Sequence, residues 1–339
     1  MMLKKESKQV DYFDEVLEKM VKKDHTYRKL MELVDFDELL LPFEDLYSEV
    51  GAPSEPLTRG FKCLLIQFWH DLSDREAATF ISDSLAARWF CRYKIDEDTP
   101  VHSYFGKLRS RIGTENLTKI FNTITSALEK AGLVGKTFTF VDSSSMIAKV
   151  STWAARDKAT EDKDNDEKDD KNNPTMNNDN VEKYSVDPDA RFGSKGKNKN
   201  WLGYKRHHQV DMKQGIITDV KITGADVNDG KAFIDEKLCP ESGMVFLDKG
   251  YDGDPVEENI KQNGCATGGI KKDNRKDKNR DLDRWRTRVR MPFENTFSKM
   301  KKHCRYWTKP KVKIQATMEA TVHNLKRAIK IGAPKLVFA

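Results

Sequence analysis

The chain has 339 residues, enough for about two domains of ordinary size. Charged residues make up 34% of the sequence against 37% hydrophobic, and the formal net charge is +6, so we expect a densely charged surface with a mild basic excess. No apolar run approaches the ~18 residues of a membrane-spanning helix, and no signal-type segment follows Met1, which excludes an integral membrane protein and favours a cytoplasmic location. Five cysteines without CxxC spacing favour reduced thiols.

The first part of the chain has helical character. Residues 1–35 are highly charged with a weak helical period, so we expect an N-terminal arm or a short helix there. Residues 36–131 have clear helical spacing, interrupted by prolines and by Gly113 as expected between successive helices. The pattern predicts an all-α domain over residues 36–131.

Two adjacent helices of this domain admit two interpretations. A helix is predicted over residues 57–70, and Ser73 with Glu76 forms a capping-box pattern that starts a second helix. The pair is compatible with a DNA-binding helix-turn-helix or with an ordinary helical hairpin of the core.

The periodicity changes after Gly132. Residues 137–142 alternate like a strand and end on Asp142, so residues 132–339 are predicted to form a mixed α/β domain. Residues 156–183 contain ten acidic and six basic residues and almost nothing apolar, which predicts a flexible insertion. An acidic loop that guards a basic cleft is the alternative for this insertion.

The remaining elements follow a recognisable order. Two strands, 204–212 and 216–222, are separated by a loop of hairpin length and predict an antiparallel pair. A helix over residues 230–238 and a buried strand over 244–248, which ends on Asp248, come next. A helix over 255–262, a short strand over 266–270 and a last helical region from Met291 onward follow them. This β-β-β-α-β-α-β-α order matches the ribonuclease H-like fold, with a mixed sheet flanked by helices.

Two carboxylates stand out by position. Asp142 and Asp248 each follow a predicted strand, and strand ends at one edge of an α/β sheet are where sites collect. Two aspartates there could share a divalent metal ion, and each could instead be a helix or turn cap.

A third carboxylate lies in a basic segment. Arg290, Glu294 and Lys301 are spaced to share one face of a helix, and Pro292 is expected in its first turn. Residues 271–311 hold sixteen Lys and Arg against five Asp and Glu, with interspersed aromatics, which favours contact with a phosphate backbone. A solvated basic face, with Glu294 as a surface ion-pair partner, is the alternative.

These blocks together resemble a known family. The strand ending in Asp142, the block Leu247-Asp248-Lys249-Gly250-Tyr251-Asp252 and the spacing Arg290-x3-Glu294-x6-Lys301 are similar to DDE transposases of bacterial insertion sequences, specifically the insertion sequence five group. The similarity extends over about residues 36–330 and includes Leu72-Ser73-Asp74-Arg75-Glu76, His102-Ser103-Tyr104-Phe105-Gly106-Lys107-Leu108-Arg109 and Asn324-Leu325-Lys326-Arg327. The chain departs from the family at Thr287, where Tyr is frequent, and at Asn228, where His is common.

The resemblance implies a chemistry. Asp142, Asp248 and Glu294 are the implied catalytic residues and would hold Mg²⁺ or Mn²⁺, two ions per site, because oxygen ligands suit hard cations. The implied reaction is metal-dependent cleavage at insertion-sequence ends, followed by attack of the freed 3′-hydroxyl on target DNA. The implied partners are double-stranded DNA, as terminal inverted repeats and target, and further copies of the chain, as a homodimer or higher homo-oligomer in a synaptic complex. The protein is then expected in the cytoplasm, with the nucleoid when bound to DNA.

Basic residues complete the predicted site. The catalytic domain is expected to grip the DNA backbone and the helical domain to read the transposon end, through Lys249, Arg286, Arg290, Lys301 and Lys302 in the first and Lys107, Arg109 and Arg111 in the second. A nuclease of the same fold without strand transfer, or a non-catalytic DNA-binding derivative, remain alternatives. If Glu294 is not the third acid, Asp281 or Asp283 is the next candidate.

Overall fold

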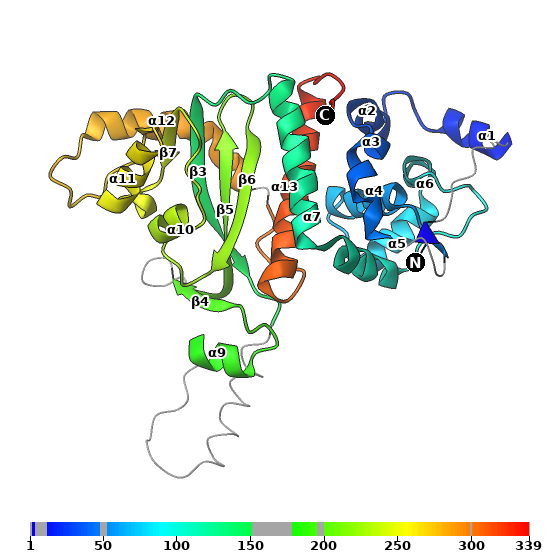
Figure 1. Cartoon of the computed structure of the whole chain (residues 1–339), viewed down its shortest axis with the longest axis horizontal. Helices are drawn as coiled ribbons and strands as arrows, with labels where there is room; N and C mark the ends of the chain where they lie inside the picture. The colour runs from blue at the N-terminus through cyan, green and yellow to red at the C-terminus, as the bar shows by residue number, and fades with distance from the viewer. Residues whose placement is uncertain are drawn as a thin grey trace, which may run out of the picture. The chain divides into compact units, whose positions relative to one another are not determined.

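The computed structural model describes residues 2–3, 12–47, 53–150, 178–194, 200–298 and 300–338 (Figure 1). The chain divides into two compact units, one of residues 1–133 with 317–339 and the other of residues 134–316. None of the helices in the described ranges has both the length and the apolar character that a membrane span requires. All five cysteines are free thiols, as expected.

The first unit is helical. Its helices are α1 (Tyr12–Met20), α2 (Thr26–Leu33), α3 (Phe36–Leu40), the 3-10 helix η1 (Leu41–Leu46), α4 (Leu57–Trp69), α5 (Asp74–Asp83), α6 (Leu85–Cys91) and α7 (His102–Lys130). Two short strands, β1 (Met2–Leu3) and β2 (Pro53–Ser54), pair in parallel. The predicted all-α character of this part of the chain is therefore confirmed, and Gly113, with a φ of 74°, interrupts the helical geometry inside α7.

Helix α4 is a core helix. Its side chains are buried on all sides between Leu57 and Phe68, so it presents no free face to a DNA groove. The capping box predicted for the next helix is present, since Ser73 Oγ accepts from Glu76 N at 3.3 Å and Glu76 Oε2 accepts from Ser73 N at 2.8 Å. In a helix-turn-helix the second helix enters the DNA groove, and only Ala77 and Ile81 of α5 are buried, so the burial of α4 is compatible with both interpretations of the pair.

The C-terminal residues pack with the helical unit. Residues 317–339, which include most of α13 (Lys309–Lys330), belong to the first unit, whereas the sequence assigned them to the catalytic domain. Leu336 N donates to Leu33 O at 2.8 Å, and Lys326 Nζ donates to Trp69 O at 2.7 Å. The buried side chains of Leu325 and Leu336 explain the difference, because the helical unit supplies apolar surface for them.

The second unit is built on a mixed sheet. Its strands are β3 (Phe138–Ile147), β4 (Arg191–Ser194), β5 (Asn200–Asp211), β6 (Ile216–Gly224), β7 (Met244–Leu247) and β8 (Ala266–Thr267). Strand β5 is antiparallel to β3, β4 and β6, while β7 is parallel to both β3 and β8. An antiparallel meander extended by parallel strands is the arrangement predicted for a ribonuclease H-like domain, and the fold class is confirmed.

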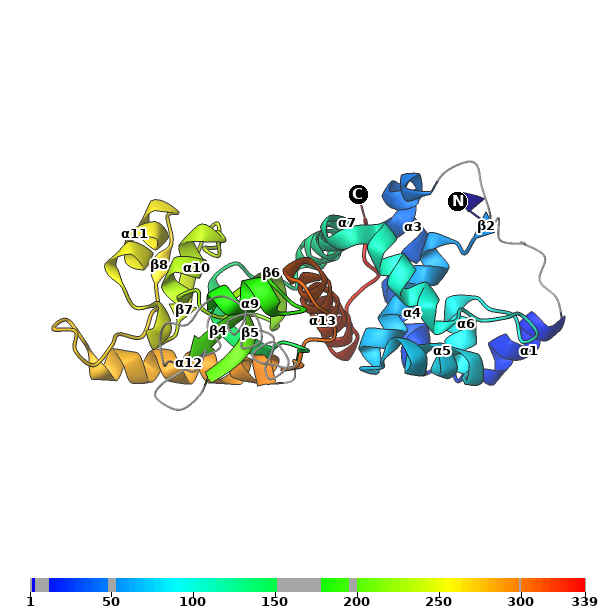
Figure 2. The same ribbon diagram turned by 90° about the horizontal axis from the view of Figure 1, so that it is seen from below.

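Helices cover both faces of this sheet. They are α9 (Asn178–Tyr184), α10 (Asp229–Asp235), the 3-10 helix η2 (Lys249–Tyr251), α11 (Asp254–Gln262) and α12 (Arg280–Ser298). Figure 2 shows α12 along one face and α10 with α11 on the other. On the α10 and α11 face, Val141, Val245 and Leu247 of the sheet form a buried apolar cluster with Phe233 and Ile260. This cluster packs the middle of β3 and the end of β7 against α10 and α11.

Two elements differ from their predicted bounds. Strand β3 continues five residues past Asp142, because its polar residues still pair with β5 up to Ile147. Helix α12 begins at Arg280, where the Asn279 side chain caps it by accepting from Asp281 N and Leu282 N, each at 3.1 Å. Pro292 is therefore inside the helix and not in its first turn.

The predicted insertion lies largely outside the described residues. Only the last part of 156–183 is described, and it forms α9, where the sequence predicted no element. Val181 is fully buried, and Asn178 Oδ1 accepts from Phe192 N at 2.7 Å. These two contacts hold α9 to β4 and explain the difference.

A buried histidine of β5 gives a pH prediction. His207 is fully buried with Nε2 at 2.9 Å from Thr223 Oγ1, and burial lowers its pKa from 6.5 to about 4. Because the unfolded chain takes up this proton at higher pH than the folded chain, the free energy of unfolding should fall by about 3 kcal/mol as the pH drops from 6.5 to 4. His207→Gln should lose this part of the pH dependence.

Urea unfolding of the parent chain and of His207→Gln, at neutral and at acidic pH, measures how the free energy of unfolding of each depends on pH. The same pH dependence in His207→Gln and in the parent chain would contradict the assignment.

Candidate active site

Asp142 and Asp248 lie beside each other at one edge of the sheet. The parallel pairing of β3 with β7 ends at Val141 and Leu247, and each aspartate is the next residue of its strand. Neighbouring strands are about 4.8 Å apart, so the two backbones remain close at this point. The expectation that these two aspartates meet at one edge is met, although Asp142 is inside a longer strand and not at its end.

Side-chain alternation assigns both aspartates to the α12 face. Asp142 is two residues after Phe140, and Asp248 is two residues after Phe246. On that face the Phe246 ring packs at 6.0 Å from the ring of Trp285, and the Arg290 guanidinium lies 5.6 Å from the Phe140 ring centre. Helix α12 therefore lies over the part of the sheet that carries the two aspartates.

Arg290 joins the second aspartate to the glutamate. Its Nη2 atom lies 3.2 Å from Asp248 Oδ1 and 3.3 Å from Glu294 Oε1, so the two carboxylate oxygens are no further apart than the sum of these distances. The Arg290 side chain is 12% exposed, while the carboxylates are 41% and 47% exposed. The largely buried Arg290 guanidinium thus contacts two carboxylates that are open to solvent.

The described residues contain no group of three or more His, Cys, Asp or Glu side chains that are close enough to hold one metal ion together. The guanidinium of Arg290 lies between Asp248 and Glu294. The three predicted acids therefore lie at one end of the sheet without being close enough together to hold one ion, and Arg290 lies between two of them.

Tyr251 and Asp229 join this region, and the sequence did not single them out as site residues. Burial raises the pKa of the Tyr251 hydroxyl well above its ordinary value, and the charges of Asp229, Asp142 and Asp248 raise it further. Tyr251 packs in the buried cluster with Val141 and Leu247, the residues that precede Asp142 and Asp248. Asp229 begins α10 and pairs with Lys205 Nζ at 3.0 Å. No sequence pattern links Asp229 to Tyr251, because they come together only when the fold places α10 next to the loop after β7.

The predicted DNA-binding residues of the second unit differ in their availability. Lys249 is exposed and pairs with Asp273 at 3.3 Å, whereas Arg286 donates to Gly269 O at 2.6 Å and to Thr267 O at 3.3 Å and so ties α12 to β8. Lys302 is exposed and Lys301 is half-buried. Lys249 and Lys302 have the exposure that contact with DNA requires.

The three candidates of the helical unit differ in the same way. Lys107 is exposed on α7. Arg109 is buried and donates to both oxygens of Asp74, at 2.9 and 2.6 Å. Arg111 donates to Ser54 Oγ at 3.1 Å and lies over the Tyr47 ring. Two of these three candidates, Arg109 and Arg111, thus have partners inside the protein.

A ribonuclease H-like sheet with two aspartates at one edge and a glutamate on the covering helix defines a class of nucleic-acid-processing domain. Residues 137–325 match the family described as the transposase DDE domain, and residues 15–111 match the family described as a transposase domain (DUF772). Since the first match covers more than half of the chain, the protein belongs to the DDE transposase family.

Solved structures of transposases have distant similarity to the chain. A piggyBac transposase synaptic complex with hairpin DNA has 10% identity and a TM-score of 0.37, over 96% of this chain and 78% of that one. A Mos1 transposase paired-end complex with left transposon end has 7% identity and a TM-score of 0.17, over 84% and 80% of the two chains. A pre-cleavage Mos1 transpososome has 7% identity and a TM-score of 0.17, over 85% and 100%. No curated protein matches the chain, so the family assignment rests on the two family matches.

Proposed function

We propose that this transposase cuts DNA at the ends of an insertion sequence and joins the freed 3′-hydroxyl to target DNA, with Asp142, Asp248 and Glu294 as the catalytic acids. The observation that carries the proposal is the register of β3 and β7, which sets Asp142 beside Asp248, together with the Arg290 contact that links Asp248 to Glu294. Membership of the DDE transposase family supports a catalytic triad of acids, and Asp142, Asp248 and Glu294 all lie within the matched residues 137–325. The insertion sequence five group remains our expectation for the subgroup.

The chemistry of the three candidate side chains suits a divalent cation. All three candidate ligands are carboxylates, which are the oxygen ligands that Mg²⁺ and Mn²⁺ prefer, and Asp248 and Glu294 are partly open to solvent. Asp142, Asp248 and Glu294 would hold the ions, two per site. Bound there, the ions would activate the attacking oxygen and stabilise the leaving oxygen of an in-line displacement.

The chain's own residues would position the DNA. Arg290 lies between two of the acids, so its guanidinium is placed to contact the scissile phosphate once a cation takes over the charge of the carboxylates. Lys249 and Lys302 are exposed and would bind flanking phosphates, since Lys249 directly follows Asp248 and Lys302 lies beside Ile147 at the end of β3. We propose double-stranded DNA, as terminal inverted repeat and target, as the substrate, and a homodimer or higher homo-oligomer as the synaptic form.

A plasmid assay tests the function. The purified chain is incubated with Mg²⁺ and a supercoiled plasmid that carries the DNA flanking its own coding sequence on both sides, with a second plasmid as target. Cleavage at the flanks and covalent joining to the target are expected. Cleavage without joining would favour the nuclease alternative, and binding without either reaction would favour a non-catalytic DNA-binding protein.

Arg290 gives a prediction about the cation. Arg290→Met removes the positive charge between Asp248 and Glu294, and the two carboxylates should then depend on a metal ion for neutralisation. Added Mg²⁺ or Mn²⁺ should stabilise this variant by about 2–3 kcal/mol at a cation concentration a hundred times its dissociation constant, and should stabilise the parent chain less at the same concentration.

Thermal unfolding with chelator and with Mg²⁺ measures this stabilisation. Arg286→Met is the control on the same helix, because Arg286 contacts Gly269, Thr267 and Asp283 and none of Asp142, Asp248 and Glu294. Equal Mg²⁺ stabilisation of both variants and the parent would contradict the role given to Asp248 and Glu294.

A further inference from the structure

His208 of β5 lies directly across the sheet from Asp142. The two residues are Cα partners in the antiparallel ladder of β3 and β5, and the register of this ladder runs evenly from Thr139 to Ile147. Directly opposite residues project to the same face of a sheet, with their Cβ atoms about 4.5–5.5 Å apart. The imidazole of His208 therefore belongs to the α12 face, beside the carboxylate of Asp142. No sequence pattern marks His208 as a site residue.

The next pair on this face shows that side chains of β5 reach across to β3. Arg206 is the Cα partner of Ser144, two residues along each strand. Its Nε atom donates to Ser144 Oγ at 3.4 Å, and its Nη2 atom donates at 3.4 Å to Lys301 O, just past the end of α12. The guanidinium is buried between the strands and this segment. The even-numbered residues of this part of β5 therefore face α12, as Asp142 does.

The surroundings of His208 supply a carboxylate on one side and an apolar side chain on the other. His208 is fully buried, and burying a polar group is costly unless it makes a hydrogen bond. Directly opposite it, β3 places Asp142 and β6 places Val220, which has no acceptor in its side chain. An imidazole has at least one N–H donor in either protonation state. Asp142 is thus the acceptor that the sheet offers to this ring.

The preceding histidine, His207, serves the opposite face of the sheet. Its Nε2 atom lies 2.9 Å from Thr223 Oγ1. Lys205, two residues earlier and on the same face, donates to Asp229 Oδ1 of α10 at 3.0 Å. The two adjacent histidines are both fully buried but face different helices, so one is a matched control for the other.

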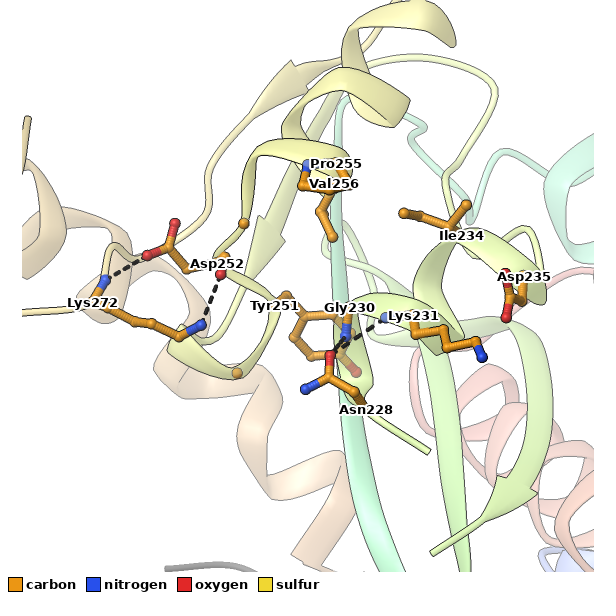
Figure 3. A pocket seen from close by; sticks show the side chains of 12 residues that line it. Asn228, Gly230, Lys231, Ile234, Asp235, Tyr251, Asp252, Pro255, Val256 and Lys272 are labelled. Carbon is orange, nitrogen blue, oxygen red and sulfur yellow. Dashed lines mark hydrogen bonds between the residues drawn. The ribbon is translucent and has the colours of Figure 1, made fainter. Parts of the chain in front are cut away.

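The α10 side of this unit also has a cavity of about 330 Å³, between α10 and the loop that follows β7 (Figure 3). Its lining is balanced in charge, with Lys231 and Lys272 beside Asp235 and Asp252. Among the described residues that line it, none belongs to β3 or β5. Substitution of either histidine therefore changes no wall of this cavity.

We propose that His208 is a positioning residue of the active site, which donates a ring N–H to one carboxylate oxygen of Asp142 and leaves the other oxygen for a divalent cation. The proposal rests on the proposed function, in which Asp142 is a cation ligand. A carboxylate held by a buried donor keeps one orientation, so less ordering is needed when the cation binds. Outer partners of this kind contribute about 10–100-fold to metal affinity or activity.

Nuclear magnetic resonance of the histidine rings tests the contact without metal or DNA. The full chain is labelled with ¹⁵N at its histidine rings, and His207→Gln and His208→Gln assign the two buried residues. Asp142→Asn removes the charge of a partly exposed side chain and should shift the ring resonances of His208, while those of His207 stay in place. Unmoved His208 resonances would overturn the proposal.

Mn²⁺ binding to the full chain, measured by the electron paramagnetic resonance of the free ion, tests the consequence. His208→Leu removes the donor and should weaken Mn²⁺ binding about 10–100-fold. His207→Leu removes an equally buried imidazole from the other face and should bind Mn²⁺ as the parent chain does. His208→Asn and His208→Gln place an amide N–H near the positions of the two ring nitrogens, so one of them should retain the affinity of the parent.

Parent-like Mn²⁺ affinity in His208→Leu would overturn the proposal. Equal losses in His207→Leu and His208→Leu, or no rescue by either amide, would also overturn it, in favour of a general effect on the fold. None of these measurements needs DNA cleavage. A chain that cuts and joins DNA but whose His208 ring does not respond to Asp142→Asn disproves the histidine's role alone, and a chain with the ring contact and the Mn²⁺ effect that never cuts DNA disproves the proposed function alone.

Discussion

Glu294→Gln should reduce DNA cleavage by about a thousandfold or more, while DNA affinity changes little. The substitution removes one negative charge from the proposed cation ligands and keeps the shape of the side chain, and loss of several kcal/mol of charge stabilisation corresponds to a rate loss of this size. Affinity should persist with the same steep salt dependence, because that slope counts phosphate contacts made by lysine and arginine. Single-turnover cleavage and salt-dependent binding on the same DNA measure the two effects separately.

Glu258→Gln is the matched control for this change. Glu258 is exposed on α11, away from Arg290, and the substitution is chemically identical. It should leave cleavage unchanged. If Glu294→Gln cleaves DNA at the wild-type rate, Glu294 is not the third catalytic acid. Asp281 and Asp283, which lie in the first turn of α12, are then the next candidates.

Arg109→Met should destabilise the helical unit by about 3 kcal/mol. Arg109 is buried and donates to both oxygens of Asp74 and to Gln67 Oε1 at 3.2 Å, so its loss leaves a partly buried carboxylate without its cation. The Asp74 side chain is 30% exposed, which places the cost at the lower end for such pairs. Amides of α4, α5 and α7 should exchange about a hundredfold faster, as measured by hydrogen-exchange mass spectrometry.

Lys107→Met separates stability from DNA contact. Lys107 is exposed, so exchange should be nearly unchanged, whereas DNA affinity should weaken and the salt slope should fall by about one phosphate contact. If Arg109→Met exchanges like the parent chain and loses only DNA affinity, then Arg109 is a DNA contact and not a core ion pair.

The comparison of these two residues shows what spacing along a helix can predict. Lys107 and Arg109 are both basic residues of α7, and the sequence gives no sign that Asp74, 35 positions earlier, will enclose one of them. The partner depends on how α5 packs against α7, which is a property of the tertiary structure. Basic composition therefore predicts a charged helix, but it does not predict which of its side chains are free to contact DNA.

The candidate acids show the reverse case. Asp142 and Asp248 each follow a run of strand-forming residues, and parallel pairing of β3 with β7 is enough to bring the two together. The spacing of Glu294 to Arg290 predicts a shared helix face, but a proline in the first turn predicts a later helix start than the structure has, since α12 begins at Arg280 and Pro292 lies inside it. Asp229 and Tyr251 had no comparable signal, since their proximity to the acids depends on a loop that crosses the end of the sheet.

The most direct measurement is the anomalous scattering of Mn²⁺ in crystals of the full chain with DNA from the flanks of its coding sequence. Anomalous peaks within about 2.0–2.6 Å of carboxylate oxygens of Asp142 and Asp248, with Glu294 completing the site, are the predicted result. Peaks that involve none of the three carboxylates, in crystals where the DNA is bound and cut, would contradict the assignment of the active site.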